Sequence, residues 1–228
     1  MKQTLIFCEG VTDQVFIADC LRVFYKIKTD RREKIVKARE PKIEVKFAND
    51  DNSIKGEIID VGGCSKLAND LHLDKIRDNK EFEGGSIVIF DADYTGKPNG
   101  NSGFESCNQK LSDIQKTKNV AFEHYIWPNH QEDGVIEHLL RGLIPSNKLP
   151  ILSCIEAHQD CLKGLGIENL RYAEHKEKIG FYLHTSNEKS EARHRNYCDT
   201  NFWNLDINGS EDLKKFKAFL DAFFEIGA

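Results

Sequence analysis

Three acidic residues occupy positions where carboxylates commonly bind ligands in α/β proteins. Glu9 follows an apolar run at residues 4–8, and Asp91 and Asp93 follow a second run at residues 86–90. The carboxyl ends of parallel strands meet at one edge of a sheet, where ligands usually bind. Side chains at i and i+2 of an extended segment point the same way, so both aspartates can face one cation. Such hard oxygen ligands suit Mg²⁺ or Mn²⁺ better than zinc. The alternative is that these acids cap helices or lie in loops.

An alternation of strands and helices would position these acids. Apolar or alternating runs predict strands at residues 4–8, 43–47, 57–61, 86–90 and 120–127. Helical recurrence of apolar residues predicts helices at residues 11–25, 67–76, 104–117, 134–143 and 213–224, while 151–165 and 179–184 are helical or mixed. This order predicts an α/β fold with a parallel sheet flanked by helices. We expect residues 1–145 to form the core and residues 146–228 a mainly helical C-terminal extension packed on it, with the boundary near Pro145 and Pro150.

The composition limits the class of protein. The chain has 228 residues, of which 39% are hydrophobic and 30% charged, which is typical of a soluble globular protein with a sizeable core. The N-terminal apolar run is too short for a signal peptide, so we expect a cytoplasmic protein without a membrane span. Seven cysteines without a CxxC pair indicate reduced thiols. Neither a GxGxxG nor a Walker A sequence occurs, so ATP hydrolysis is not indicated.

A basic segment interrupts the pattern at residues 26–42. It is treated as an insertion in the core, and its cations are Lys26, Lys28, Arg31, Arg32, Lys34, Lys37, Arg39 and Lys42. The net charge is −5, so nucleic-acid binding would need such a local patch or bound metal ions. The alternative is a solvated helix or insertion.

The motifs around the acids resemble those of the Toprim domain of topoisomerases, primases and small nucleases. Residues 9–13 read EGxxD, a glycine pair follows at 62–63, and residues 91–96 read DxDxxG. The resemblance covers about residues 1–130. It implies a Rossmann-like fold in which Glu9, Asp91 and Asp93 bind divalent metal, with Glu9 also a general acid or base and Asp13 structural. One departure is Val11, where many relatives carry lysine.

A narrower resemblance is to stand-alone Toprim proteins related to the nuclease domain of overcoming-lysogenization-defect (OLD) proteins. It rests on Pro128-Asn129 followed by GxxExLL at residues 134–140. It implies a second metal site, for which Glu137 is the candidate, with Asp133 and Glu132 as weaker ones. Lys176 and Lys178 resemble a lysine that stabilises developing negative charge. The alternatives are a solvent-facing Glu137 and simple surface lysines.

Two function classes follow from these motifs. The first is a Mg²⁺- or Mn²⁺-dependent nuclease acting on DNA or RNA, in which two metals would clamp a phosphodiester. The second is a non-catalytic Toprim module that binds nucleic acid or a partner at the same edge. Nucleotidyl transfer of the primase kind ranks last. A partner ATPase and a role in phage defence or repair are implied by the resemblance alone.

Two further patterns are weaker. Cys154, His158 and Cys161 are spaced i, i+4 and i+7, as on one face of a zinc-binding helix, but burial in the core is the favoured interpretation. The stretch at 193–195 reads Arg-His-Arg, with Tyr197 and Trp203 nearby. Such interleaving is typical of single-strand binding surfaces, and the alternative is that Trp203 anchors the C-terminal region.

Overall fold

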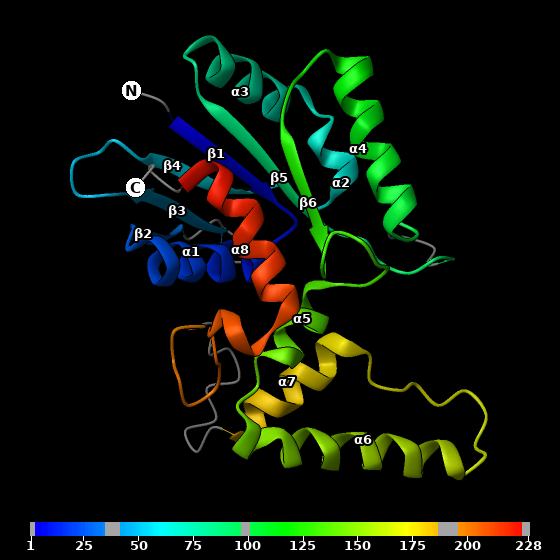
Figure 1. The fold of residues 1–228 in the computed structure, drawn as a ribbon. Coiled ribbons are helices and arrows are strands. Elements are labelled where there is room, and N and C mark those ends of the chain that lie inside the picture. The colour runs from blue at the N-terminus through cyan, green and yellow to red at the C-terminus, as the bar shows by residue number, and fades with distance from the viewer. Residues whose placement is uncertain (1–2, 35–41, 97–100, 187–195, 225–228) are drawn as a thin grey trace.

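A six-stranded sheet organises the computed structural model, which describes residues 3–34, 42–96, 101–186 and 196–224 (Figure 1). Its order is β2-β3-β4-β1-β5-β6. The strands are β1 (Gln3–Cys8), β2 (Lys28–Lys34), β3 (Lys42–Ala48), β4 (Lys55–Asp60), β5 (Gly85–Asp91) and β6 (Glu123–Trp127). The five predicted strands are confirmed, and β2 is additional.

The sheet is parallel over four strands and antiparallel at one edge. Strand β1 pairs in parallel with β4 and β5, and β5 pairs in parallel with β6. Strands β2 and β3 are antiparallel to each other, and β3 is antiparallel to β4. The predicted parallel sheet is thus confirmed for β4, β1, β5 and β6, and the antiparallel pair β2 and β3 extends it at one edge. Residues 28–34 form a strand and not the solvated helix considered for the basic segment, while residues 35–41 lie outside the described ranges.

Helices cover both faces of the sheet because its strands alternate apolar side chains between two cores. Ile6 and Cys8 point into a core shared with α1 (Val11–Tyr25), α5 (Ile136–Gly142) and α8 (Glu211–Phe224). Leu5 and Phe7 point into a second core. This core includes side chains from α2 (Cys64–Leu67), α3 (Asp70–Glu81) and α4 (Phe104–Lys118). Figure 1 shows α8 lying across the first face.

The order of the strands creates a switch point between β1 and β5. These strands are neighbours, but the helix that follows β1 packs in the first core and the helix that follows β5 packs in the second. The two connections leave the carboxyl edge in opposite directions, which opens a crevice between them. Glu9 and Asp91 lie at the carboxyl ends of these two strands.

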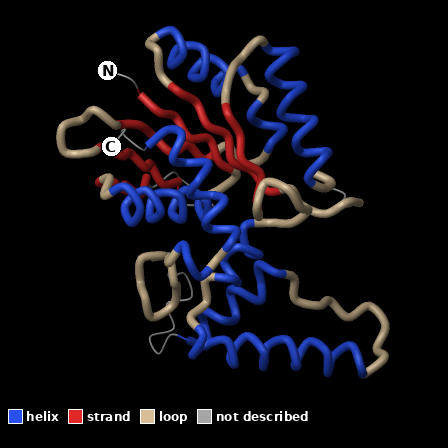
Figure 2. Tube along the Cα trace, in the orientation of Figure 1, coloured by secondary structure: helices blue, strands red, loops and turns tan. Residues whose placement is uncertain are grey.

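Between α5 and α8 the described chain is helical or irregular and lies below the sheet in Figure 2. It contains α6 (Leu149–Gly164), α7 (His175–Ser186) and two 3-10 helices, Ser146–Lys148 and Ile207–Gly209. Helix α8 then returns to the sheet, where the Phe216 and Trp127 rings are 4.6 Å apart. Its apolar stripe is buried at Leu213, Phe216, Leu220 and Phe224, as predicted. Among the described residues, no helix is both long and apolar enough to cross a membrane.

Candidate active site

A cavity of about 650 Å³ lies at the switch point, between the carboxyl edge of the sheet and the start of α7. Six of the residues singled out from the sequence line it, namely Glu9, Asp91, Asp93, Glu137, Lys176 and Lys178. They come from the ends of β1 and β5, the first turn of α5 and the first turn of α7. The fold thus brings together side chains that are up to 169 positions apart, from residue 9 to residue 178.

Glu9, Asp91, Asp93 and Glu137 form the acidic wall of the cavity. Asp91 is held in it by two hydrogen bonds. Its backbone amide donates a hydrogen bond to Oε2 of Glu9 at 3.3 Å, which ties the ends of β5 and β1 together. Its Oδ1 accepts a hydrogen bond of 2.8 Å from the backbone amide of Ile136, at the start of α5. Asp91 thus connects the sheet to the helix that carries Glu137.

Asp13 adds a further, buried carboxylate next to this wall. It is 5% exposed, its Oδ2 accepts from the Gly10 amide at 3.2 Å, and its Oδ1 accepts from Nε1 of Trp127 at 2.9 Å. The pKa of Asp13 is raised from 3.8 to about 8, chiefly by burial and then by the negative charges of Glu9 and Glu137. The hydrogen bond from Trp127 acts in the opposite direction. The structural role expected for Asp13 is consistent with these contacts.

The pKa of Asp91 is also raised. Burial is the largest cause, followed by the negative charges of Asp13, Glu9 and Glu137. Each of these carboxylates therefore makes the ionised form of the others less favourable. A cation placed among them would offset this repulsion.

Asp93 reaches the cavity in a way that the sequence argument did not anticipate. Its backbone is in the left-handed region, with φ at 58°, so the i, i+2 rule for extended segments does not hold there. Backbone hydrogen bonds of 2.7 and 2.8 Å pair Asp93 with Gly134. The Asp93 Oδ2 accepts from the amide of Asn101 at 2.8 Å. The side chain is 5% exposed and lines the same cavity as Asp91.

Asp133 and Glu132 do not line the cavity. Asp133 Oδ1 accepts from the amide of Phe104 at 2.7 Å, and Oδ2 accepts from the Thr95 hydroxyl at 2.9 Å. These hydrogen bonds lower the pKa of Asp133 and fix the start of α4 against the loop after β5. Glu132 accepts from the side-chain amide of Asn129 at 3.0 Å. Both acids hold loops around the site.

The acids do not form a ready-made metal-binding group. Within the described ranges, no three His, Cys, Asp or Glu side chains are arranged so that they could hold a metal ion as they stand. The donor chemistry nevertheless fits a hard cation, because Glu9, Asp91, Asp93 and Glu137 offer only carboxylate oxygens.

Three ring side chains, those of Tyr94, His138 and His175, gather next to these residues, and sequence reasoning missed them. The Tyr94 hydroxyl and Nε2 of His138 share a hydrogen bond at 2.6 Å, and the ring of His175 lies 3.9 Å from that of His138. The pKa of His175 is lowered to about 4, first by burial and then by His138, Lys178 and Arg141. Each ring residue lies within three positions of a predicted site residue. This proximity along the sequence is the signal that could have identified the three residues.

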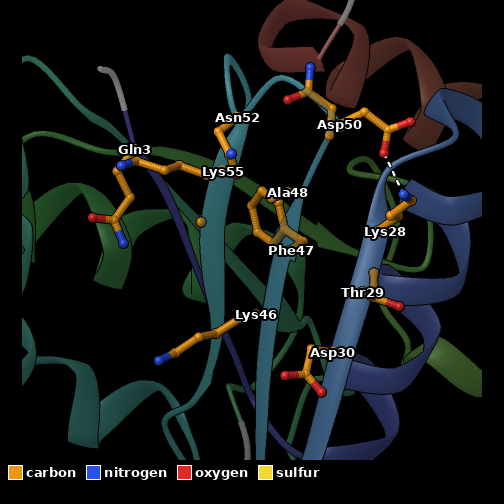
Figure 3. Close-up of a pocket in the computed structure, with 12 residues that line it drawn as sticks. Gln3, Lys28, Thr29, Asp30, Lys46, Phe47, Ala48, Asp50, Asn52 and Lys55 are labelled. Atoms are coloured by element: carbon orange, nitrogen blue, oxygen red, sulfur yellow. Dashed lines mark ion pairs between the residues drawn. The ribbon is translucent and has the colours of Figure 1, made fainter.

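A second, shallow cavity of about 630 Å³ lies at the antiparallel edge, and Lys28, Thr29 and Asp30 of the basic segment contribute to its lining (Figure 3). Three described cations of the segment, and Lys46 of β3, pair with acids, whereas Lys26 is exposed and donates to the Val23 carbonyl. The ion pairs are Lys28–Asp50 at 2.6 Å, Arg32–Asp30 at 2.8 Å, Lys46–Glu44 at 3.2 Å, and Arg31–Asp19. Lys37 and Arg39, and the side chains of Lys34 and Lys42, lie outside the described part of the chain, so the predicted patch is untested there.

The weaker patterns have separate outcomes. Cys154, His158 and Cys161 are exposed on α6, so the expectation that they pack in the core is wrong. They belong to no metal-binding group among the described residues. Tyr197 and Trp203 are buried, with rings 5.2 Å apart, so Trp203 anchors the C-terminal region. Residues 193–195 lie outside the described ranges.

Comparisons with known proteins give a family but no activity. A family model described as "Protein of unknown function (DUF3226)" matches residues 3–225. A search of curated proteins found no match. A solved structure of a hypothetical protein from Pyrococcus horikoshii OT3 is similar with a TM-score of 0.45 and 14% sequence identity, over 98% of this chain and 91% of that one.

Proposed function

The chain belongs to the family described as "Protein of unknown function (DUF3226)", and we propose that it is a divalent-metal-dependent phosphodiesterase of the Toprim type that cleaves nucleic acid. One observation carries the proposal. Five carboxylates, those of Glu9, Asp91, Asp93, Glu137 and Glu174, and two lysines line a single cavity at the switch point of a mostly parallel sheet. Structural roles alone would not require this convergence of charge.

The acids would hold Mg²⁺ or Mn²⁺. Glu9, Asp91 and Asp93 are the ligands of the first site, and Glu137 extends the set toward a second. Bound metal would supply Lewis-acid polarisation of the phosphodiester. Because ligands must be ionised, protons compete with the metal at the acids whose pKa is raised.

The two lysines that line the cavity would bind the phosphate groups of the substrate. Lys178 is half-buried and lines the cavity, where its ammonium group can offset negative charge that develops on the phosphate. Lys176 also lines the cavity but is exposed, which suits a contact with the nucleic-acid backbone outside the reacting group. Asp133 keeps the loop of Thr95 in place and so positions the neighbouring Asp93.

The second candidate is a binding module without catalysis. One observation favours it, the departure at Val11 from the lysine of many Toprim relatives. It would use the same cavity. A separate ATPase partner and a role in phage defence or repair are proposals that rest on the resemblance, and a cytoplasmic location is a further proposal.

The test is metal-dependent cleavage by the purified full chain. Plasmid, single-stranded DNA and structured RNA are incubated with Mg²⁺ or Mn²⁺, with EDTA, and with the variants Asp91→Asn and Glu132→Gln. We expect cleavage that EDTA abolishes, that Asp91→Asn abolishes and that Glu132→Gln retains, since Glu132 is exposed outside the cavity. Cleavage unchanged in Asp91→Asn would refute the assignment. Mn²⁺ binding without cleavage of any substrate would support the binding module.

A further inference from the structure

Tyr94, His138 and His175 form a ring cluster at the mouth of the candidate active site. The Tyr94 ring lies 5.7 Å from that of His138 and 6.0 Å from that of His175, where the two planes are 28° apart. The rings of His138 and His175 are 3.9 Å apart. The rings come from three elements, the loop after β5, α5 and α7, so only the tertiary fold brings them together.

The ring cluster adjoins the charged residues of the cavity in the sequence and in the fold. Tyr94 directly follows Asp93, and His138 directly follows Glu137. His175 begins α7 one turn before Lys178. Tyr94 and His175 themselves line the cavity, and Tyr94 is 38% exposed. A ligand in the cavity would therefore meet carboxylates, ammonium groups and flat rings at once.

We propose that the ring cluster stacks one unpaired base of a single-stranded nucleic acid and thereby sets the substrate class of the site. The inference rests on the proposed function, because the phosphate next to that base would lie between the acids and Lys178. Every base has a flat face that aromatic side chains can stack on, irrespective of sequence. Bases inside a duplex have both faces covered by their neighbours, so a duplex would have to release a base first.

The dimensions and charge of the cavity agree with this ligand. A volume of about 650 Å³ lies within the range of pockets that enclose one small ligand, about 300–1,000 Å³. The lysines match the negative charge of the sugar-phosphate backbone. The shared hydrogen bond between Tyr94 and His138 fixes the tyrosine ring before any ligand binds, which lowers the entropy cost of stacking.

The hydrogen bond itself offers a competing, purely structural reason for the cluster. The two reasons make different demands on Tyr94. Stacking needs the ring and not the hydroxyl, whereas a structural lock needs the hydroxyl. Tyr94→Phe and Tyr94→Ala therefore separate them.

The experiment measures equilibrium binding of the full chain to fluorescent oligonucleotides, with Ca²⁺ in place of Mg²⁺ and a check that the probes stay intact. The probes are oligothymidylate, an abasic strand of equal length and charge, and a duplex. Stacking of one base contributes about 1–3 kcal/mol, which corresponds to roughly 5- to 150-fold in affinity. We expect oligothymidylate to bind at least about 5-fold more tightly than the abasic strand and more tightly than the duplex.

The variants show which side chain reads the base. Tyr94→Ala and His175→Ala should lose the preference for oligothymidylate over the abasic strand, whereas Tyr94→Phe should keep it. Phe82→Ala, which removes an aromatic residue that is 77% exposed on another part of the surface, should bind as the wild type does. Equal affinity of the wild type for both strands, or an equal loss for both in Tyr94→Ala, would overturn the inference. Tighter binding of the duplex would overturn the single-strand assignment.

The outcome is separable from that of the proposed function. Metal-dependent cleavage without any base preference would leave the phosphodiesterase standing and reject the stacking site. Base-dependent binding without cleavage in Mg²⁺ or Mn²⁺ would leave the stacking site standing in a binding module.

Discussion

Nε1 of Trp127 donates a hydrogen bond of 2.9 Å to Oδ1 of Asp13, so the last residue of β6 holds a buried carboxyl group of α1 beneath the candidate active site. Both side chains are almost fully buried. A buried carboxyl group without partners is unfavourable, and here the indole and the Gly10 amide provide partners for its two oxygens. The pair thus couples the packing of the first core to the electrostatics of the acidic wall.

We expect Trp127→Phe to destabilise the fold by on the order of 1–3 kcal/mol, because it leaves Oδ1 of Asp13 without its donor. A double-mutant cycle with Asp13→Asn, measured by urea unfolding, isolates the pairwise interaction from the lost ring volume. Additive effects of the two changes would show that the hydrogen bond contributes nothing measurable.

The stability of the metal-free protein should fall as the pH rises through neutrality. The pKa of Asp13 is about 8 in the folded state against 3.8 as its ordinary value, so the folded state holds a proton that the unfolded state has lost. The stabilisation is complete below about pH 4 and is lost as pH approaches 8. The pKa of His124 and of His175 is lowered to about 4, so these residues reduce stability only below about pH 6.5.

Thermal unfolding between pH 6.5 and 8.5 checks this slope without interference from those histidines. Asp13→Asn should make it shallower, and the raised pKa of Asp91 accounts for a slope of the same sign that remains. Mn²⁺ should also flatten it, because a bound cation stabilises the ionised carboxylates. A melting temperature that rises over this interval in the presence of EDTA would contradict the assignment.

Asp133→Ala should lower stability by about 1 kcal/mol, the usual loss when a helix terminus loses its capping carboxylate. The reason is that the Phe104 amide and the Thr95 hydroxyl lose their acceptor. Calorimetric titration should find Mn²⁺ affinity within a few fold of the wild type. Asp91→Asn provides the contrast, with a large loss of Mn²⁺ binding. Equal losses in both variants would place Asp133 among the ligands.

Lys178→Met should lower kcat by about 10²–10³ while leaving KM within a few fold, since its charge acts on the transition state. Lys176→Met should mainly raise KM, because Lys176 is exposed and would contact the nucleic-acid backbone. Lys163→Met, on the exposed surface of α6 beside Asp160, is the matched control and should change neither constant. A uniform rise of KM in both cavity variants would assign both lysines to binding.

The sequence predicted where in the fold Glu9 and Asp91 lie, because their positions depend on local pattern. An apolar run ends at Glu9 and another at Asp91, and parallel strands bring such ends together whatever the rest of the chain does. The apolar stripe of α8 was likewise readable from its spacing. These features follow from periodicity along one element.

The features that were missed depend on contacts between distant elements. Lys28–Lys34 carries so much charge that it lacks the apolar alternation of a strand, and it forms one because β3 and its ion pairs complete the edge. Cys154 was expected in the core from residue type alone, but α6 turns that face outward. His138 and His175 are 37 positions apart and meet only through the packing of α5 against α7.

The return of α8 to the sheet also has a consequence for how the chain is made. The hydroxyl of Tyr25 donates to Asp221 across 196 positions, and Phe216 packs on Trp127. During synthesis the ribosome adds about 5–20 residues per second, so the acids emerge several seconds before the helix that completes their supporting core. Until residues 211–224 emerge, the nascent chain leaves the apolar side chains of α1 and β6 that pack on α8 uncovered.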